Sequence, residues 1–409
     1  MKNSTNFDVI IVGAGPAGII CAMQLAKKGY QIALFEKETF PRDKTCGDAL
    51  SVDILNQLEL IDADLAKRFL AFSKKIPSYG VKIIAPSTES FDIPFFYKGI
   101  KRSAFIAKRI DFDDFLFNEL RQFRTISIFE NSKVCDIKME NDFTRVALQN
   151  GENYTAQLIV GSDGAHSVVK KILGNNKVNP NHYSAGLRVY YENVSHFNEE
   201  NYIELHFFKE ILPGYLWIFP LPNNQANVGI GMLSKYVSKK NVNLKKTLEE
   251  LLKTHPSLKN RFKNAIPLEK PKGFGLPLGN RKRKISGNRY LLLGDAAGLI
   301  DPFSGEGIGN AIRSGRVAAI HLESCFIQHN FSKTKNKEYD IEIYKRMGTE
   351  FKVSKWLQKI CKYPRLFNFI VSKANSNKYL KEFLIGTMEN IEKKKLLMSP
   401  IFYFKLFFR

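Results

Sequence analysis

Three glycines near the amino terminus have the spacing of a dinucleotide-binding turn. Gly13, Gly15 and Gly18 follow the apolar run at 7–12 in a G-x-G-x-x-G pattern. In such a turn the first glycine permits a tight bend, the second admits a pyrophosphate, and the third lets the next helix pack closely. The amino terminus of that helix adds free N–H groups for phosphate oxygens. We therefore expect a dinucleotide to bind at Gly13, Gly15, Ala17 and Gly18.

An acidic residue and two later motifs indicate which dinucleotide binds. Glu36 ends the second apolar run, about 20 residues beyond the glycine turn, where an acid accepts hydrogen bonds from ribose hydroxyls. Asp163 and Gly164 follow another apolar run, and so does Asp295. The carboxylate of Asp295 can accept a hydrogen bond from a ribityl hydroxyl. Together these motifs favour FAD over NAD.

A second glycine-rich helix start supports the same cofactor. Gly305, Gly307 and Ile308 precede a helical pattern, and backbone N–H groups there can hold the carbonyl edge of a flavin. We also place Lys37 and Val134 beside the cofactor.

The apolar patterns predict the elements that must hold these residues. Residues 7–36 have the pattern of a strand, a helix and a strand, which is the βαβ unit of a nucleotide-binding domain. Residues 176–275 alternate and are rich in aromatics, which favours a mostly antiparallel sheet. We expect an α/β fold with a Rossmann-type FAD-binding domain, a mostly antiparallel substrate-binding sheet and a helical carboxyl-terminal region.

The nucleotide-binding motifs are scattered, so one domain must be assembled from separate segments. We predict a composite FAD-binding domain from residues 1–75, 101–175 and 276–330. The substrate-binding sheet then comes from residues 76–100 and 176–275, and the helical region, with a basic and aromatic tail, from residues 331–409.

The three motifs together resemble the FAD-dependent oxidoreductases shaped like aromatic hydroxylases, over about residues 5–330. The stretch from Arg109 through Phe112 and Asp113 to Leu116 also matches that group. The resemblance implies that Arg109 lies near the FAD ribose and phosphates.

Two segments resemble the geranylgeranyl reductase branch of these flavoproteins. One is P-x-x-K-x-C-G at 41–47, with Lys44, Cys46 and Gly47. The other is Y-x-W-x-F-P at 215–220, a strand that lines the substrate cavity in the family. This chain has Leu221 where many members carry a lysine, which leaves the substrate open. The resemblance places Lys44, Cys46 and Gly47 along the FAD.

The chemical role of the cysteine has two interpretations. A thiol at Cys46 is small, forms weak hydrogen bonds and could supply a proton, or it could be a small apolar wall residue. Tyr215 and Trp217 could likewise line the cavity or pack the core of the sheet. We assign Cys46, Tyr215 and Trp217 as candidate catalytic residues.

The resemblance implies a reductase that passes hydride from reduced FAD to a double bond of a prenyl lipid or diphosphate. The electron donor could be NADPH, ferredoxin or a quinol. One alternative is a monooxygenase or halogenase, since 215–220 is close to the halogenase pattern W-x-W-x-I-P, with Tyr215 in place of its first tryptophan. Another is a flavoprotein without catalytic activity that anchors at a membrane.

The net charge of +22 over 409 residues suggests an anionic partner, or simply a solvated lysine-rich surface. The tail at 393–409 combines lysines with aromatics, as expected for contact with an anionic membrane, although it could also dock on its own domain. No nucleic-acid module and no metal-ligand spacing is present. Five widely spaced cysteines fit a reduced, cytoplasmic setting. The tail then suggests a protein that is peripheral at the inner face of the membrane.

Overall fold

The first large sheet contains the glycine turn at one end of its central strand. The computed structural model describes residues 6–97, 99–174, 178–389, 391–399 and 401–402. The sheet has the order β10-β2-β1-β13-β12-β11, and β21 pairs with β13 and with β20. Its strands are β1 (Asn6–Val12), β2 (Ile32–Phe35), β10 (Ile126–Phe129), β11 (Val134–Met139), β12 (Thr144–Leu148), β13 (Asn153–Gly161), β20 (Ser286–Gly287) and β21 (Tyr290–Leu292).

The strands of this sheet that carry the cofactor motifs run parallel. β1 pairs in parallel with β2 and β13, and β13 pairs in parallel with β21. Parallel strands are covered on both faces, which explains why β1 and β2 are almost continuously apolar. Because parallel strands end at the same edge, the residues after β1, β2, β13 and β21 come together there, at Gly13, Glu36, Asp163 and Asp295.

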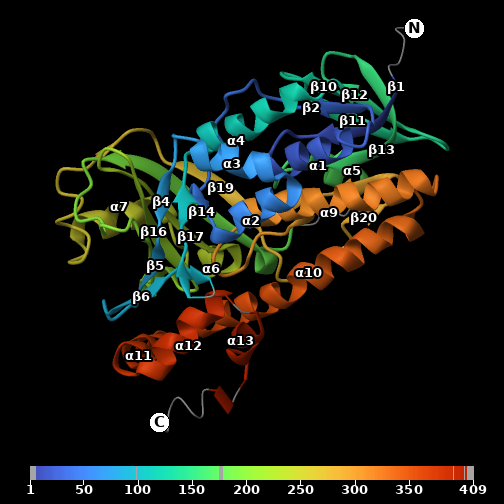
Figure 1. The fold of residues 1–409 in the computed structure, drawn as a ribbon. Coiled ribbons are helices and arrows are strands. Elements are labelled where there is room, and N and C mark those ends of the chain that lie inside the picture. The colour runs from blue at the N-terminus through green and yellow to red at the C-terminus, as the bar shows by residue number, and fades with distance from the viewer. Residues whose placement is uncertain (1–5, 98, 175–177, 390, 400, 403–409) are drawn as a thin grey trace.

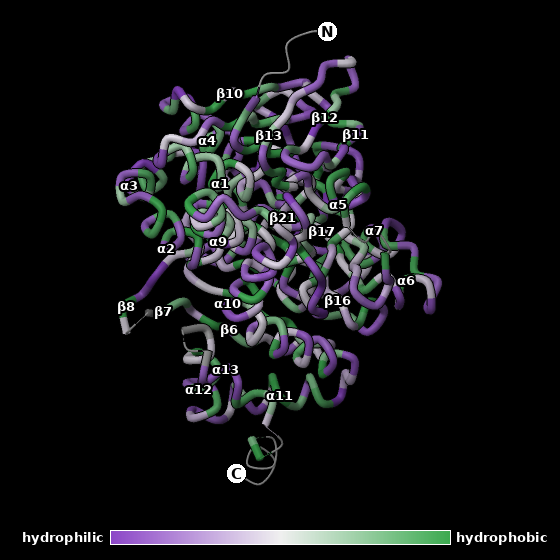
Figure 2. The backbone as a smooth tube through the Cα atoms, turned by 90° about the vertical axis from the view of Figure 1, so that its right-hand side faces the viewer, coloured by the Kyte–Doolittle hydropathy of each residue, from purple (hydrophilic) through white to green (hydrophobic). Residues whose placement is uncertain are grey.

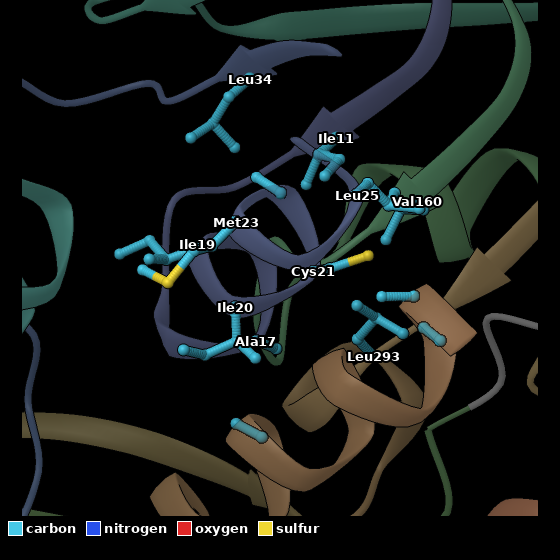
Figure 3. Close-up of a cluster of buried hydrophobic side chains, with 14 of the residues drawn as sticks. Ile11, Ala17, Ile19, Ile20, Cys21, Met23, Leu25, Leu34, Val160 and Leu293 are labelled. Atoms are coloured by element: carbon cyan, nitrogen blue, oxygen red, sulfur yellow. The ribbon is translucent and has the colours of Figure 1, made fainter. Parts of the chain in front are cut away.

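Two buried helices pack beside the central strand. α1 (Pro16–Ala26) lies between the sheet and α9 (Ile308–Ile327), as Figure 3 shows for the side chains around Cys21 and Leu293. α1 is apolar on all sides, as expected of a helix without a solvent face. The two helices approach closely at Gly315, where a β-carbon would lie 2.3 Å from the carbonyl oxygen of Ala17.

The second large sheet is antiparallel except for one pair of strands. Its order is β18-β14-β17-β16-β15-β5-β6, β19 also pairs with β14, and only β15 and β5 run parallel. Its strands are β5 (Gly80–Ile84), β6 (Ser90–Pro94), β14 (Tyr183–Glu192), β15 (Ile203–His206), β16 (Gly214–Leu221), β17 (Gln225–Leu233), β18 (Ile266–Pro267) and β19 (Lys272–Pro277).

Alternation along β16 gives this sheet two apolar faces. Trp217 and Phe219 join one buried cluster, whereas Leu216 and Ile218 join another on the opposite face, beneath α7 (Leu244–Thr254). The face with Trp217 can therefore pack toward the first sheet, whereas α7 covers the opposite face.

Short elements connect the two sheets. The strands β3 (Ala49–Leu50), β9 (Ala104–Ile106) and β4 (Ile76–Ser78) form a small sheet, and β7 (Phe96–Tyr97) pairs with β8 (Ile100–Lys101). The remaining short elements are α2 (Val52–Ile61), α3 (Ala63–Ala71), α4 (Arg109–Asn118), η1 (Glu119–Gln122), α5 (Val168–Leu173), η2 (Pro180–His182), η3 (Lys209–Ile211), α6 (Ser234–Lys239) and α8 (Gly294–Ala297).

The carboxyl-terminal region is a helical arm, as the sequence predicts. α10 (Lys333–Ile360) starts against α9 and β20 and extends toward the second sheet (Figure 1). Its successors α11 (Pro364–Ser376), α12 (Lys378–Glu389) and α13 (Ile391–Leu396) lie below β6 in Figure 2, where α11 and α12 contact that strand. In the described part of the chain no helix combines the length and apolar character needed to cross a bilayer. Residues 403–409 of the tail lie outside the described residues.

The α/β fold with these two sheets and the helical arm is confirmed. The exact division into composite domains stays a prediction. Within 76–100, β4 belongs to the small sheet, whereas β5 and β6 belong to the second large one.

Two helical glycines offer a matched test of the α1–α9 packing. We expect Gly315→Ala to lower the free energy of unfolding by roughly 1–3 kcal/mol, because its methyl group would overlap backbone of α1. Gly348→Ala in α10 has no neighbour nearer than 3.9 Å, so it should raise that free energy by about 0.4–1 kcal/mol. Urea unfolding of both variants measures the difference, and a stabilised Gly315→Ala protein would contradict the close packing.

Candidate active site

One large cleft is lined by residues of both large sheets. Its volume is about 1340 Å³, whereas pockets for single small ligands typically occupy roughly 300–1,000 Å³. The cleft therefore has room for a dinucleotide and a second ligand. Most of the residues predicted from the sequence line it, namely Gly13, Gly15, Glu36, Lys37, Lys44, Cys46, Gly47, Arg109, Val134, Asp163, Gly164, Tyr215, Trp217, Asp295, Gly305, Gly307 and Ile308.

The glycine turn leaves its backbone open to the cleft. Gly13 has φ of +97°, and a β-carbon there would lie 2.7 Å from the carbonyl oxygen of Ser162. Gly15 precedes the first turn of α1. By contrast, Ala17 and Gly18 do not line the cleft. Gly18 lies directly behind the turn, where a β-carbon would come within 2.2 Å of the carbonyl oxygen of Gly13. Gly18 thus supports the turn from behind, whereas Ala17 packs against Gly315 of α9.

Glu36 is buried at the edge of the cleft in a polar cluster. Its Oε2 accepts a hydrogen bond from the N–H of Ala14 at 3.0 Å and lies 3.5 Å from Nε of Arg42. Arg42 also donates to Asp113 at 2.9 Å and to the carbonyl oxygen of Ala14 at 3.2 Å. The sequence analysis did not identify Arg42, which ties the carboxylate of Glu36 to the glycine turn.

Arg109 forms a buried ion pair with Asp113, which lies one turn further along α4. It is only 2% exposed, and it donates to Asp113 at 2.7 and 2.6 Å. Burial alone would raise the pKa of Asp113, but the Arg109 guanidinium lowers it below its usual range. The backbone N–H of Arg109 also donates to Oδ1 of Asp48 in the cysteine loop, at 3.3 Å. Arg109 therefore connects the helix to the cysteine loop.

Two aspartates lie where the sequence predicts cofactor contacts. Lys44 Nζ lies 2.9 Å from Oδ2 of Asp295, which joins the cysteine loop to the residue after β21. Asp163 Oδ2 accepts from the N–H of Val168 at 2.6 Å. Its Oδ1 is buried and has no hydrogen-bond partner among the described residues, which leaves it available to a ligand in the cleft. An open glycine turn and a buried acceptor at the same edge fit FAD.

A buried hydrogen-bond network fixes the cysteine loop against the second sheet. Asn227 donates to the carbonyl oxygen of Cys46 and to Oδ2 of Asp48, both at 2.8 Å, and accepts from the indole N–H of Trp217 at 2.9 Å. Tyr190, which is opposite Asn227 on the neighbouring strand, donates to Asp48 at 2.6 Å. One amide therefore joins the loop, the carboxyl and the aromatic strand.

Asp48 is the carboxyl at the centre of this network. It is fully buried, has φ of +69°, and its Oδ1 accepts from the N–H of Arg109 at 3.3 Å. Burial raises its pKa to about 6. Because Asp48 accepts from Arg109, Tyr190 and Asn227, its position is fixed. The cysteine loop that carries it is therefore held in one direction as it enters the cleft.

The aromatic strand both packs the core and forms the cleft wall. Trp217 is 5% exposed, and Gly229 opposite it leaves space for the indole, since a β-carbon there would lie 2.0 Å from the ring. Gly47 would bring a β-carbon to 2.9 Å from the ring of Phe219. The family resemblance places Gly47 along the FAD. The structure adds that the aromatic strand also requires a glycine there.

The other end of the cleft is apolar. Tyr215 donates its hydroxyl to the carbonyl oxygen of Ser304, which fixes the ring beside Trp217. Beyond these two residues, the wall contains the apolar side chains of Val81, Phe95, Phe105, Ile203, Leu205 and Phe274, and Lys101 and Arg102 line the cleft beside Phe95. This arm of the cleft suits a long hydrophobic ligand.

The sequence analysis missed Arg42, Asp48, Tyr190 and Asn227. Asn227 carried a signal, because a polar side chain in the middle of a buried strand needs a partner. The described residues contain no group of three or more side chains that could hold a metal, and the five cysteines are free.

Comparison with known proteins identifies related sequences. Residues 6–326 match the family described as FAD binding domain. The chain is 28% identical over 366 residues to the digeranylgeranylglycerophospholipid reductase of Methanococcus vannielii, and the alignment covers 87% of each protein. It is 27% identical over 327 residues to the menaquinone reductase of Mycolicibacterium smegmatis, with 77% of this chain and 76% of that protein covered.

Solved structures share the fold. A geranylgeranyl bacteriochlorophyll reductase-like protein from Thermoplasma acidophilum aligns with a TM-score of 0.79 at 24% identity, covering 90% of this chain and 92% of that one. The halogenase PltM aligns with a TM-score of 0.73 at 18% identity, covering 96% and 86%. At these identities both comparisons establish the fold alone.

The Asn227 network makes a prediction for stability. In Asn227→Ala, the Trp217 indole and the Asp48 carboxyl each lose a buried partner, at a cost of roughly 1–3 kcal/mol for each group left unpaired. Asn118→Ala, at an exposed amide that bonds within its own helix region, should change the free energy of unfolding by less than about 0.5 kcal/mol. Urea unfolding followed by circular dichroism distinguishes them. Equal midpoints for the two variants would show that the network does not stabilise the fold.

Proposed function

Because this chain belongs to the FAD binding domain family and is an FAD-dependent oxidoreductase, we propose that it reduces carbon–carbon double bonds in the prenyl chain of a lipid or diphosphate. The main support for the proposal is that the cofactor motifs and the apolar arm line the same cleft. The relatives are named as reductases of a digeranylgeranyl lipid and of menaquinone, and we infer a substrate of that hydrophobic kind.

The residues at the polar end of the cleft would hold FAD. We assign the pyrophosphate to the turn at Gly13 and Gly15, a ribose to Glu36, and the flavin side to Lys44, Asp295 and the start of α9. Lys37 and Val134 lie at the same end of the cleft as Glu36. When bound and reduced, FAD supplies a hydride to the alkene.

The apolar arm would position the alkene and exclude water. A prenyl chain lying along Val81 and Leu205 would bring a double bond to the region between Cys46 and Trp217, which line the same cleft. Cys46 and Trp217 would then define the shape of the reaction space, and Tyr215 would hold the wall that contains them. The electron donor could be NADPH, ferredoxin or a quinol.

An anaerobic experiment tests the function. The flavin is reduced with dithionite, a geranylgeranyl lipid or diphosphate is added, and flavin reoxidation is followed together with the mass of the product. We expect reoxidation with a gain of two hydrogens in the product. A flavin that stays reduced until oxygen is admitted would refute the reductase and favour the monooxygenase or halogenase alternative. Flavin that reacts with neither would favour a protein without catalytic activity.

Two neighbouring positions on β5 test the route of the substrate. Val81 lines the apolar arm, whereas Lys82 points away from it and pairs with Asp92. We expect Val81→Trp to retain flavin but to lower kcat/KM for a long prenyl substrate by about tenfold or more, since the indole would fill the arm. Lys82→Trp should retain both flavin and activity. Equal kcat/KM values for the two variants would place the substrate elsewhere.

We further propose that the tail binds an anionic membrane, from which a prenyl substrate would be taken. Residues 403–409 carry two cations and four apolar aromatic or aliphatic side chains besides a tyrosine. Deleting them should weaken sedimentation with phosphatidylglycerol vesicles severalfold, and added salt should weaken binding of the intact chain. Replacing Arg281 and Lys282 with alanine removes the same charge from an exposed loop, so it is the control and should have a smaller effect. If the two variants lose vesicle binding equally, the overall charge of the protein and not the tail determines binding.

A further inference from the structure

A carboxyl group that the site description did not use lies in the cleft wall at the start of α9. Glu306 lines the cleft between Gly305 and Gly307, which the sequence analysis assigned to the cofactor. Its side chain turns back over the first turn of α9, since a β-carbon at Gly309 would lie 2.4 Å from Oε1 of Glu306. The carboxyl is therefore held beside the expected flavin position without being required for the glycine turn itself.

The hydroxyl of Ser51 is directed at this carboxyl. Ser51 occupies the N-cap position of α2, where a serine side chain ordinarily accepts a hydrogen bond from its own helix. No such bond forms here, and the hydroxyl donates to Oε1 of Glu306 instead. Ser51 also lines the cleft, so the two groups form a polar pair in its wall.

A polar branch of the cleft extends from this pair. It is lined by Asp53 and Asn56 of α2, Arg313 of α9 and Glu350 of α10. Arg313 bridges the branch, with 2.6 Å to Asp53 and 3.2 Å to Glu350, and Asp53 is 31% exposed. Asp53 and Glu350 are both partly exposed carboxylates, so this side of the cleft wall brings the half-buried carboxyl of Glu306 close to groups that exchange protons with solvent.

The electrostatic surroundings of Glu306 bring the loss of its proton close to neutral pH. Burial raises its pKa to about 7, the hydrogen bond from Ser51 lowers it, the carboxylates of Asp53 and Asp301 raise it, and Arg313 lowers it. A group whose pKa lies near the working pH can both give and regain a proton efficiently.

We propose that Glu306 donates the proton that accompanies hydride transfer, with Ser51 as its hydrogen-bond partner. The inference rests on the proposed reductase function. The alkene receives a hydride, with two electrons, from the reduced cofactor at one carbon, and the proton of the Glu306 carboxyl at the other, directly or through the Ser51 hydroxyl. The cofactor is oxidised, the alkene becomes a saturated bond, and the carboxylate of Glu306 regains a proton from solvent through the polar branch.

The other candidate donors in the cleft are engaged by neighbouring groups. The Tyr215 hydroxyl donates to the Ser304 carbonyl, and its pKa is raised by burial. Asp48 accepts from Tyr190, Asn227 and the Arg109 backbone. Glu306 instead has a hydroxyl as partner and a route to solvent, which are the features that a reusable proton donor requires.

Infrared spectroscopy of the protein without substrate tests the protonation state directly. We expect a protonated carboxyl C=O band that disappears with a midpoint near pH 7 and is absent from Glu306→Gln. The control is Glu342→Gln, at a surface carboxylate of α10 paired with Arg346, which should retain the band. If Glu306→Gln and wild type have identical spectra from pH 5 to pH 9, the proposal is wrong whatever the activity.

Single-turnover reoxidation of the reduced enzyme by a prenyl substrate tests the catalytic role. A donor must be protonated, so the wild-type rate should fall as the pH rises through about 7. Glu306→Gln should lose this dependence and react about 10²-fold or more slowly at pH 6, the scale typical of general acid catalysis. Glu342→Gln should behave as wild type, and flavin absorbance confirms that each variant retains its cofactor.

Two neighbours of Glu306 should move this pH dependence in opposite directions. Ser51→Ala removes a hydrogen bond that lowers the pKa of Glu306, so the fall in rate should shift to higher pH. Asp53→Asn removes a carboxylate that raises the pKa, so the fall should shift to lower pH. If wild type is active and Glu306→Gln is equally fast with the same pH dependence, this proposal fails alone. If wild type reduces no prenyl substrate, the proposed function fails and this proposal fails with it.

Discussion

The amide of Asn227 is the contact on which the architecture of the cleft depends. It is one side chain in the centre of the second sheet, yet it bonds to the cysteine loop, to the buried carboxyl of Asp48 and to the indole of Trp217. An amide can do this because it carries both donors and acceptors in a fixed plane. The two sheets are thus joined by directional bonds as well as by apolar contact, and the cofactor end of the cleft is fixed relative to its apolar arm.

Local sequence patterns indicated the parts of the candidate site whose residues lie close together in the sequence. The glycine turn, the acid after β2 and the acids after β13 and β21 are each defined by residues close in sequence, and parallel pairing brings them together at one edge. The aromatic strand was also identified, although its double role emerged only from the packing. Trp217 lines the cleft and belongs to the core, because Gly229 across the sheet leaves room for the ring.

The contacts that were missed join residues far apart in the chain. Asp48 and Asn227 are 179 positions apart, and Ser51 and Glu306 are 255 positions apart. No spacing rule connects such pairs, and each member taken alone could be a surface residue. Their burial and the resulting pKa shifts depend on how loops from different sheets meet. Ala17 and Gly18 belong to the recognised motif but do not line the cleft: Gly18 packs against the turn itself, and Ala17 packs against Gly315 of α9.

The contact between Gly47 and Phe219 has a consequence for how this protein can vary. The ring occupies the space that any side chain at position 47 would need, so these positions form one steric unit although 172 residues separate them. A larger residue at position 47 becomes tolerable only after the ring at 219 has been reduced. The cysteine loop and the aromatic strand are therefore coupled sterically, so a change in the shape of the reaction space at one of them requires room at the other.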